Sequence, residues 1–161
     1  MQFARSFALA ALPFLILASS ITPAAAQEEG ETPYWASIRA GEVNMRVGPN
    51  ENYRIAWVYR RLDLPLKVVR KKDGWRLVRD ADGAQGWVVS RFLSRERTAI
   101  VTGKGPAAMR EQPEDGSTLR WKAAPGVVGR LGDCEEGWCR FNVGGRQGWV
   151  RQDRLWGAGE P

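Results

Sequence analysis

Apolar residues downstream of position 33 occur in short segments that Gly, Asp and Asn interrupt. These segments are rich in Val, Ile, Leu and Trp, a composition that favours β-strands. None of them keeps an apolar spacing of i, i+3 and i+4 over three helical turns, so no helix is predicted. Asp82-Gly83 and Gly144-Gly145 are typical of tight hairpin turns. The pattern therefore predicts an all-β protein made of small, strongly bent barrels with about five strands each.

The pattern of strands and turns occurs twice along the chain. The two copies share anchor residues whose separation stays between 62 and 64 positions. The matched anchors are Met45-Arg46 with Met109-Arg110, Trp57 with Trp121, Gly74-Trp75 with Gly137-Trp138, Gly86-Trp87-Val88 with Gly148-Trp149-Val150, and Leu93 with Leu155. So few insertions across so many anchors indicate a duplicated unit of about 55–60 residues. We place the first unit at residues 36–95, a linker at 96–105, the second unit at 106–156 and a tail at 157–161.

Side-chain alternation along each predicted strand indicates which residues face the core. The expected inward residues are Ile55, Trp57 and Tyr59 in the first unit and Leu119, Trp121, Ala123, Cys139, Phe141 and Val143 in the second. Trp138 alternates with the last three and points the other way, together with Arg140. For Trp138 and its counterpart Trp75 two interpretations stay open. Each ring covers the end of its barrel, or each lines a ligand groove.

The N-terminal segment has the pattern of a secretory signal peptide. Arg5 precedes an apolar run over residues 7–21, and Ala24-Ala25-Ala26 supplies small residues for cleavage after about Ala26. The run is short for a membrane span of about 20 apolar residues, so a retained anchor is the less favoured alternative. Residues 27–35 form an acidic leader, and no later segment is apolar enough to span a bilayer. We expect a periplasmic or secreted protein, which is a monomer.

Cys134 and Cys139 are the only cysteines, and the chain has no histidine. A zinc site needs four ligands as a rule, and a redox pair has the spacing C-x-x-C, so neither fits. Gly137 marks a turn between the two cysteines, and exported proteins meet an oxidising environment. Opposed residues of a hairpin lie within disulfide range. We therefore predict a disulfide across a hairpin and no metal.

Residues 43–93 resemble the bacterial SH3 family (SH3b) in the form found in exported proteins of Gram-negative bacteria. The resemblance rests on Asn44, Arg46, Gly48, Pro49, Gly74, Trp75, Asp82, Gly83, Gly86, Trp87, Val88 and Leu93. The second unit matches more loosely, because Ala108 replaces the Asn and Glu111-Gln112-Pro113 replaces Val-Gly-Pro. The resemblance implies two tandem SH3-like β-barrels without catalytic activity. It also implies targeting to cell-wall material or to partner proteins.

Enzymatic activity is not expected from the residues themselves. Without histidine, neither a Ser-His-Asp nor a Cys-His arrangement can form. The acidic pair Glu135-Glu136 could in principle cleave glycosides, but a solvated turn at a hairpin tip explains it better. We predict no cofactor.

Basic residues are concentrated in the first unit. Without residues 1–26 the chain has 23 basic and 18 acidic residues. Residues 34–103 contain 14 basic and 7 acidic residues, whereas residues 104–161 contain 9 and 8. Export argues against nucleic acid as a partner. An ordinary solvated basic surface, or attraction to an anionic polymer of the envelope, explains the charge.

The leading hypothesis is recognition of peptidoglycan through the first unit. The expected ligand-binding residues are Asn44 and Arg46 as polar contacts, Tyr53, Trp75 and Trp87 as aromatic contacts, and Arg76 at the rim. Two alternatives stay open: Arg46 braces the barrel through backbone carbonyls, and Trp87 packs against the first strand. Trp35 and Trp156 have no counterpart in the other unit and are expected to cover the seam between the units.

The rival hypothesis is an adaptor that binds another envelope protein. A peptidoglycan-binding protein should leave Trp75 and the basic rim exposed. An adaptor should instead show an exposed apolar patch or an occupied sheet edge.

Overall fold

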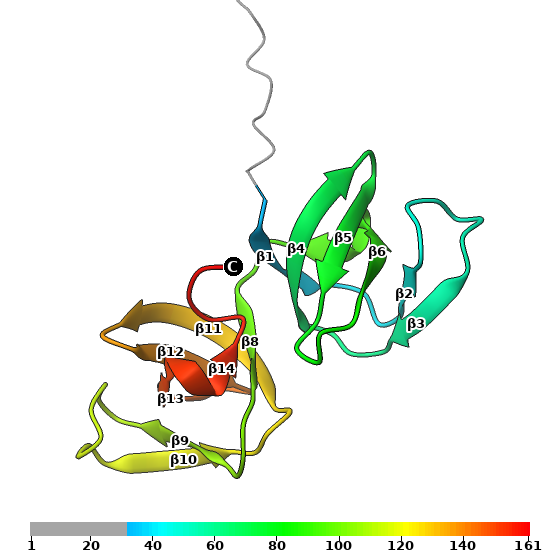
Figure 1. The fold of residues 1–161 in the computed structure, drawn as a ribbon. Helices are drawn as coiled ribbons and strands as arrows, with labels where there is room; N and C mark the ends of the chain where they lie inside the picture. The colour runs from blue at the N-terminus through cyan, green and yellow to red at the C-terminus, as the bar shows by residue number, and fades with distance from the viewer. Residues whose placement is uncertain (1–31) are drawn as a thin grey trace, which may run out of the picture.

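The computed structural model describes residues 32–161. The predicted signal peptide and residues 27–31 of the leader lie outside this range. The described chain contains fourteen strands and two short 3-10 turns and no α-helix, which confirms the all-β prediction. The strands form two seven-stranded sheets, each curled into a small barrel (Figure 1). Between residues 32 and 161 there is no helix long and apolar enough to cross a membrane.

The first unit has the strand order β3-β2-β6-β5-β4-β1-β7. Its elements are β1 (Tyr34–Ile38), β2 (Val43–Arg46), β3 (Ile55–Tyr59), β4 (Pro65–Lys72), β5 (Trp75–Arg79), β6 (Gln85–Val89), the 3-10 turn η1 (Ser90–Phe92) and β7 (Leu93–Ser94). All neighbouring strands are antiparallel. The buried core is aliphatic, with Ile38, Leu66 and Val68 among its fully enclosed side chains.

The second unit repeats this order as β10-β9-β13-β12-β11-β8-β14. Its elements are β8 (Thr98–Val101), β9 (Ala107–Arg110), β10 (Leu119–Ala123), β11 (Val128–Glu135), β12 (Trp138–Val143), β13 (Arg146–Arg151), the 3-10 turn η2 (Gln152–Arg154) and β14 (Leu155–Trp156). The same permutation in both sheets confirms the predicted tandem repeat. A separate core is built around Phe141, Met109 and Val150.

Each unit has seven short strands where about five were expected. One difference lies at the start of the units, because residues 98–101 of the expected linker form β8, and Tyr34 and Trp35 of the expected leader belong to β1. Ala99 and Val101 of β8 are fully buried, so this segment is part of the second core. The remaining difference is the two-residue strand that closes each sheet, which is too short for a sequence pattern to show.

The repeated Gly-Trp-Val motif has a packing reason. A Cβ atom added at Gly86 would lie 2.6 Å from the Cγ atom of Met45, and one added at Gly148 would lie 2.9 Å from the Cβ atom of Met109. Real Cβ atoms do not approach other atoms this closely. Glycine therefore lets β6 and β13 pass directly against β2 and β9, which is how each barrel closes.

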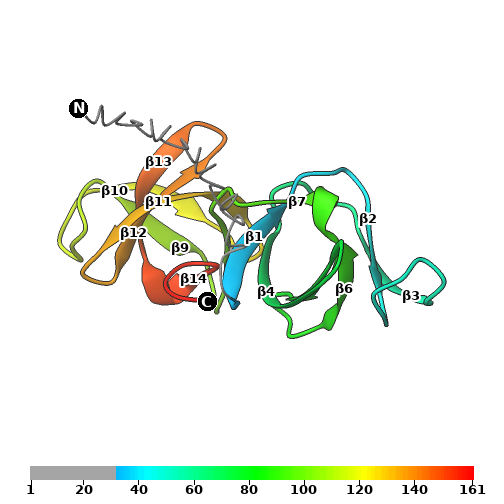
Figure 2. The same cartoon turned by 90° about the horizontal axis from the view of Figure 1, so that it is seen from above.

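The predicted burial of the edge strands was wrong. Trp57 is 58% exposed and Trp121 is 43% exposed, and Ile55 and Leu119 are exposed as well. Trp57 pairs with the buried Met45, so the alternation placed it on the correct, core-facing side. However, β3 and β10 are the edge strands of their sheets, and the β2–β3 hairpin projects beyond its barrel (Figure 2). Only Tyr59 and Ala123, at the barrel ends of these strands, are buried as expected.

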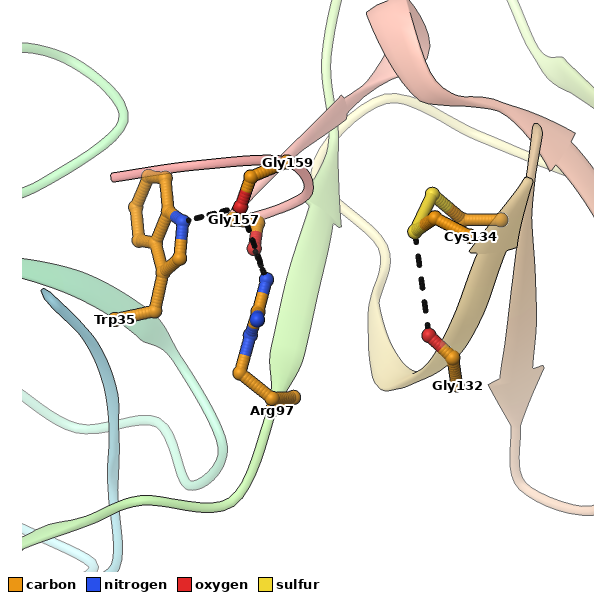
Figure 3. Close-up of a disulfide and its surroundings, with 7 residues drawn as sticks. Trp35, Arg97, Gly132, Cys134, Gly157 and Gly159 are labelled. Carbon is orange, nitrogen blue, oxygen red and sulfur yellow. Dashed lines mark hydrogen bonds between the residues drawn. A yellow bond between two sulfur atoms is a disulfide. The ribbon is translucent and has the colours of Figure 1, made fainter. Parts of the chain in front are cut away.

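The predicted disulfide is confirmed. Cys134 and Cys139 pair directly across the β11–β12 hairpin, with an S–S distance of 2.04 Å and a Cα–Cα distance of 4.0 Å (Figure 3). The turn between them needs left-handed backbone at Glu136 and Gly137, whose φ angles are 48° and 80°. Glycine adopts this conformation without steric cost, which explains its place in the motif.

Trp35 and Trp156 meet at the seam between the units. Their ring centroids are 4.8 Å apart and their planes make an angle of 78°. The indole nitrogen of Trp35 also donates a hydrogen bond to the carbonyl oxygen of Gly159, at 3.0 Å (Figure 3). Arg97 donates to the carbonyl oxygen of Gly157 at 2.9 Å. The C-terminal residues therefore lie against β1 of the first unit, and they are structural rather than a loose tail.

Candidate functional site

Arg46 braces its own hairpin. Its guanidinium donates to the carbonyl oxygen of Tyr53 at 2.7 Å, and Arg110 donates to the carbonyl oxygen of Ser117 at the same distance. The two arginines occupy matching positions of the repeat, and so do their acceptors. Each arginine thus ties the loop of its hairpin to the strand before it, in β2–β3 of the first unit and in β9–β10 of the second. This geometry agrees with the bracing interpretation of Arg46.

The aromatic residues expected in the first-unit site differ in accessibility. Trp87 is only 5% exposed, and the guanidinium of Arg70 lies over its ring, 5.2 Å from the centroid. Trp75 is half-buried. Tyr53 is half exposed, and its ring lies so close to Gly48 that a Cβ there would be 2.6 Å away. The packing interpretation of Trp87 therefore fits the geometry, and its ring face is not open to a ligand.

Arg76 does not lie on the rim of a groove. It is 9% exposed, and it donates to the hydroxyl of Tyr34 at 3.1 Å and to the carbonyl oxygen of Asp73 at 2.9 Å. As the neighbour of Trp75 in β5, it points to the opposite face of the sheet. The structure thus brings Arg46, Tyr53 and Trp87 together, while Arg76 lies apart from them. Asn44 is half-buried and pairs with Val58 on the edge strand.

An open groove lies on the second unit, where sequence reasoning did not place it. It is open to solvent and has a volume of about 520 Å³. Its floor is the outer face of β11, β12 and β13, and its wall is the β9–β10 hairpin. The lining residues are Arg110, Glu111, Gln112, Arg120, Arg130, Leu131, Gly132, Arg140, Phe141, Asn142, Gln147, Gly148 and Trp149. Four arginines and one glutamate make this groove strongly basic.

The floor of the groove consists of two rows of side chains that cross the sheet. In one row Arg130 pairs with Asn142, which pairs with Gln147. In the other row Arg140 pairs with Trp149, which pairs with Arg110. Directly paired residues share a face with Cβ atoms about 4.5–5.5 Å apart. Because the intervening Leu131 and Phe141 are buried in the core, both rows face outward.

Each arginine of the groove has a different set of contacts. Arg120 pairs with Glu111 at 2.7 Å, and Arg130 pairs with Glu96 at 3.1 Å. Arg110 is engaged with the Ser117 carbonyl oxygen, as described above. The guanidinium of Arg140 lies over the Trp149 ring, 4.9 Å from its centroid. In the described part of the chain, Arg140 has no carboxylate or carbonyl acceptor.

The first unit has a related but different surface at the same place. Its rows are Lys67, Arg79 and Gln85, and Leu77, Trp87 and Arg46. Leu77 therefore stands where the second unit has Arg140, and Arg79 stands where it has Asn142. Both faces are basic, and in both a guanidinium lies over the tryptophan ring. In the second unit it comes from Arg140, directly opposite Trp149, whereas in the first unit it comes from Arg70 of β4. The two units share a fold and differ in the side chains of this face.

The buried acidic residue Asp80 has a structural task. It accepts a hydrogen bond from the Tyr59 hydroxyl at 2.9 Å and from the backbone N–H groups of Asp82 and Ala84. Burial and the neighbouring Asp80 raise the pKa of Tyr59 far above its ordinary value. Asp80 thus holds the β5–β6 turn.

Glu135 and Glu136 are exposed at their hairpin tip. Residues 32–161 contain no cluster of three or more acidic or cysteine side chains that could hold a metal ion.

A curated protein of Bacillus subtilis (strain 168) is similar to most of this chain. It is named "Putative N-acetylmuramoyl-L-alanine amidase YrvJ" and is 28% identical over 155 residues. The match covers 88% of this chain and 27% of that protein, so the chain spans about a quarter of its relative's length.

Two solved structures share a weaker likeness. NlpC2 from Trichomonas vaginalis is 17% identical with a TM-score of 0.36, over 78% of this chain and 48% of that chain. An NlpC/P60 family protein from Bacillus cereus ATCC 10987 is 13% identical with a TM-score of 0.35, over 76% of this chain and 56% of that chain. Likeness at this level carries no argument about function.

The family assignment rests on the two units themselves. A family model described as "Bacterial SH3 domain" matches residues 39–95 and residues 103–157. Each matched range contains six of the seven strands of one sheet, and β1 and β8 lie just before the two ranges. The chain belongs to the bacterial SH3 domain family, with two copies of the domain in tandem.

Proposed function

We propose that the protein is a non-catalytic binding module of the bacterial envelope that recognises peptidoglycan. The observation that carries this proposal is the open basic groove of the second unit. A groove open along its length suits a polymer better than a small molecule that must be enclosed. Its guanidinium and amide groups suit a ligand with carboxylates and peptide bonds, and the peptide stems of peptidoglycan have both.

The similarity to the Bacillus subtilis protein supports this proposal. That relative is named for N-acetylmuramoyl-L-alanine, which is part of peptidoglycan. The present chain corresponds to about a quarter of it, so the amidase activity named there is not carried over. Binding to the same material, without cleavage, is the function that we propose for the shared part. It agrees with an envelope or extracellular location.

The absence of catalysis is part of the proposal and rests on the state of the acidic residues. Asp80 is occupied by three hydrogen bonds, and Glu135 and Glu136 lie on a solvated turn. Glu111 in the groove is paired with Arg120. Acid or base catalysis by a carboxylate needs a group that is free to reach the scissile bond. None of these four residues is placed in that way.

The proposal is tested by co-sedimentation of residues 27–161 with purified sacculi across a salt series. We expect the protein to pellet at low and moderate salt, with weakening as salt increases, because charge pairs at an exposed surface are screened. The Trp75→Ala variant should pellet like the wild type, since Trp75 belongs to the first unit and is half-buried. No pelleting at any salt concentration would exclude peptidoglycan as the ligand.

A second function, as a protein-binding adaptor, is favoured by one separate observation. Val47, Tyr53, Ile55 and Trp57 are exposed together on the β2–β3 hairpin, and β3 is the edge strand of its sheet. An extended segment of another protein could add to such an edge. Chemical crosslinking in envelope extracts tests this function, with Trp57→Ser compared with Trp121→Ser. A crosslinked partner protein that is lost with Trp57→Ser and kept with Trp121→Ser would support the adaptor function.

A further inference from the structure

We infer that Arg140 is the centre of a carboxylate-binding site in the groove of the second unit, and that its ligand is the acidic peptide part of peptidoglycan. This inference rests on the proposed function and names the chemical group that the groove recognises. It assigns recognition to the second unit, whereas the sequence placed it in the first.

Arg140 is the guanidinium of the groove that remains available. Arg120 and Arg130 are paired with Glu111 and Glu96, and Arg110 is tied to a backbone carbonyl oxygen. A ligand carboxylate would have to compete with these partners. Arg140 is exposed and, among residues 32–161, contacts only the Trp149 ring through its guanidinium. An incoming carboxylate can therefore pair with Arg140 without displacing an internal partner.

Stacking on Trp149 prepares Arg140 for binding. The indole is almost fully buried and fixed between Arg140 and Arg110 in the cross-strand row. A guanidinium that lies on an aromatic ring keeps its N–H edge free and loses less rotational freedom when it binds. The guanidinium fork matches the two oxygens of a carboxylate, so the pair can be bidentate. In the first unit Leu77 stands opposite Trp87, and the guanidinium over that ring comes from Arg70 of β4, at 5.2 Å from the centroid, outside the groove of the second unit.

The other groups of the groove favour a peptide over a phosphate. Asn142 and Gln147 lie in the neighbouring row, about 7 Å along the strands, and Gln112 lies on the wall. The two glutamines can both donate to and accept from the backbone of a peptide, and Asn142 can donate, since its Oδ1 already accepts the backbone N–H of Gly145 at 2.9 Å. Glu111 is paired with Arg120, and its carboxylate can also accept a hydrogen bond from an ammonium group of a ligand. Peptides with carboxylates, amides and an amine satisfy all of these groups.

The test is a calorimetric titration of residues 27–161 with a soluble muropeptide that has free carboxylates. The same muropeptide with its carboxylates amidated and inorganic phosphate are the comparison ligands. Arg140→Gln should lower the affinity for the free muropeptide about ten-fold, as expected for loss of a charge-assisted pair. Arg140→Lys should lower it less, because the charge remains and the fork is lost. Near-ultraviolet circular dichroism verifies that each variant keeps the native packing.

Arg54→Gln is the matched control, because it removes the same charge from an exposed arginine of the first unit. Its affinity should equal that of the wild type. The inference is overturned if Arg140→Gln binds the free muropeptide like the wild type, or if Arg140→Gln and Arg54→Gln lose affinity equally. It is also overturned if the amidated muropeptide or phosphate binds as well as the free muropeptide. Sacculi are pelleted in parallel: if Arg140→Gln pellets normally, the inference fails and the proposed function stands. If wild-type protein binds neither sacculi nor muropeptide, both fail.

Discussion

The ring of Trp35 in β1 packs edge-on against the ring of Trp156 in β14, with 4.8 Å between their centroids. These two residues are 121 positions apart and belong to different units, and neither has an aromatic counterpart in the repeat. The C-terminal residues add hydrogen bonds to Trp35 and Arg97 at the same place. The seam therefore depends on residues that the two units do not share.

We expect the seam to couple the unfolding of the two units. Trp35→Ala removes the ring pair and the bond to Gly159, which together contribute about 1–3 kcal/mol. Urea unfolding of the wild type should show one transition, and that of the variant should show two or a broadened one. Trp57→Ala, which removes an exposed tryptophan far from the seam, is the control and should leave the transition unchanged. Identical unfolding curves for wild type and Trp35→Ala would contradict this account.

The disulfide should stabilise the β11–β12 hairpin that supplies half of the groove floor. Replacing both Cys134 and Cys139 by serine removes a small closed loop, and we expect a loss of about 2 kcal/mol in the free energy of unfolding. Part of the loss comes from Cys139, which is fully buried and would become a polar side chain. Reduction of the wild type with dithiothreitol isolates the cross-link itself. If both treatments leave the midpoint of urea unfolding unchanged, the disulfide has no role in stability.

The repeated glycines provide a test of the barrel closure. Gly86→Ala and Gly148→Ala would force a Cβ against Met45 or Met109, and we expect each to cost about 1–3 kcal/mol of stability, as overpacking does. Gly74→Ala is a suitable control because a Cβ at that position meets no atom within 4 Å. Thermal unfolding followed by circular dichroism measures all three. A destabilisation by Gly74→Ala as large as that of the other two would argue against close strand approach as the cause.

Stability should fall at alkaline pH because of Tyr59. Burial, the first cause, and the nearby Asp80 carboxylate raise the pKa of this phenol in the folded protein above the ordinary value of 10.0. At pH values below the ordinary pKa the phenol is protonated in both states, so its contribution to stability is complete. Above about pH 10 the unfolded chain releases the proton and the folded protein retains it, so stability declines as pH rises. Melting temperatures from pH 8 to 11 should therefore fall more steeply for the wild type than for Tyr59→Phe; parallel slopes would contradict this assignment.

The sequence predicted the fold well because its signals are local. Gly-Trp-Val motifs, hairpin turns and the spacing of two cysteines each report on a few neighbouring residues, and all of them hold in the structure. The first strand of each unit was missed because β1 and β8 lie in segments that look like a leader and a linker. Their burial depends on pairing with β4 and β11, which lie about 30 residues further along the chain.

The site could not be placed from charge composition. Residues 104–161 have nearly equal numbers of basic and acidic residues, so the charge count pointed to the first unit as the basic one. In three dimensions Arg110, Arg130 and Arg140 come from three strands to one face, while Glu135 and Glu136 lie at a hairpin tip. One signal was present in the sequence, because alternation with the buried Phe141 indicated that Arg140 points outward. Combining such outward positions across strands requires the register, which the sequence does not contain.

The most direct measurement is the co-sedimentation of sacculi with wild-type protein, Arg140→Gln and Arg54→Gln at one moderate salt concentration. The two variants have the same net charge, so general attraction to an anionic polymer affects them equally. We predict that wild type and Arg54→Gln pellet alike and that most of Arg140→Gln remains in the supernatant. Equal pelleting of the two variants would contradict recognition through the groove of the second unit.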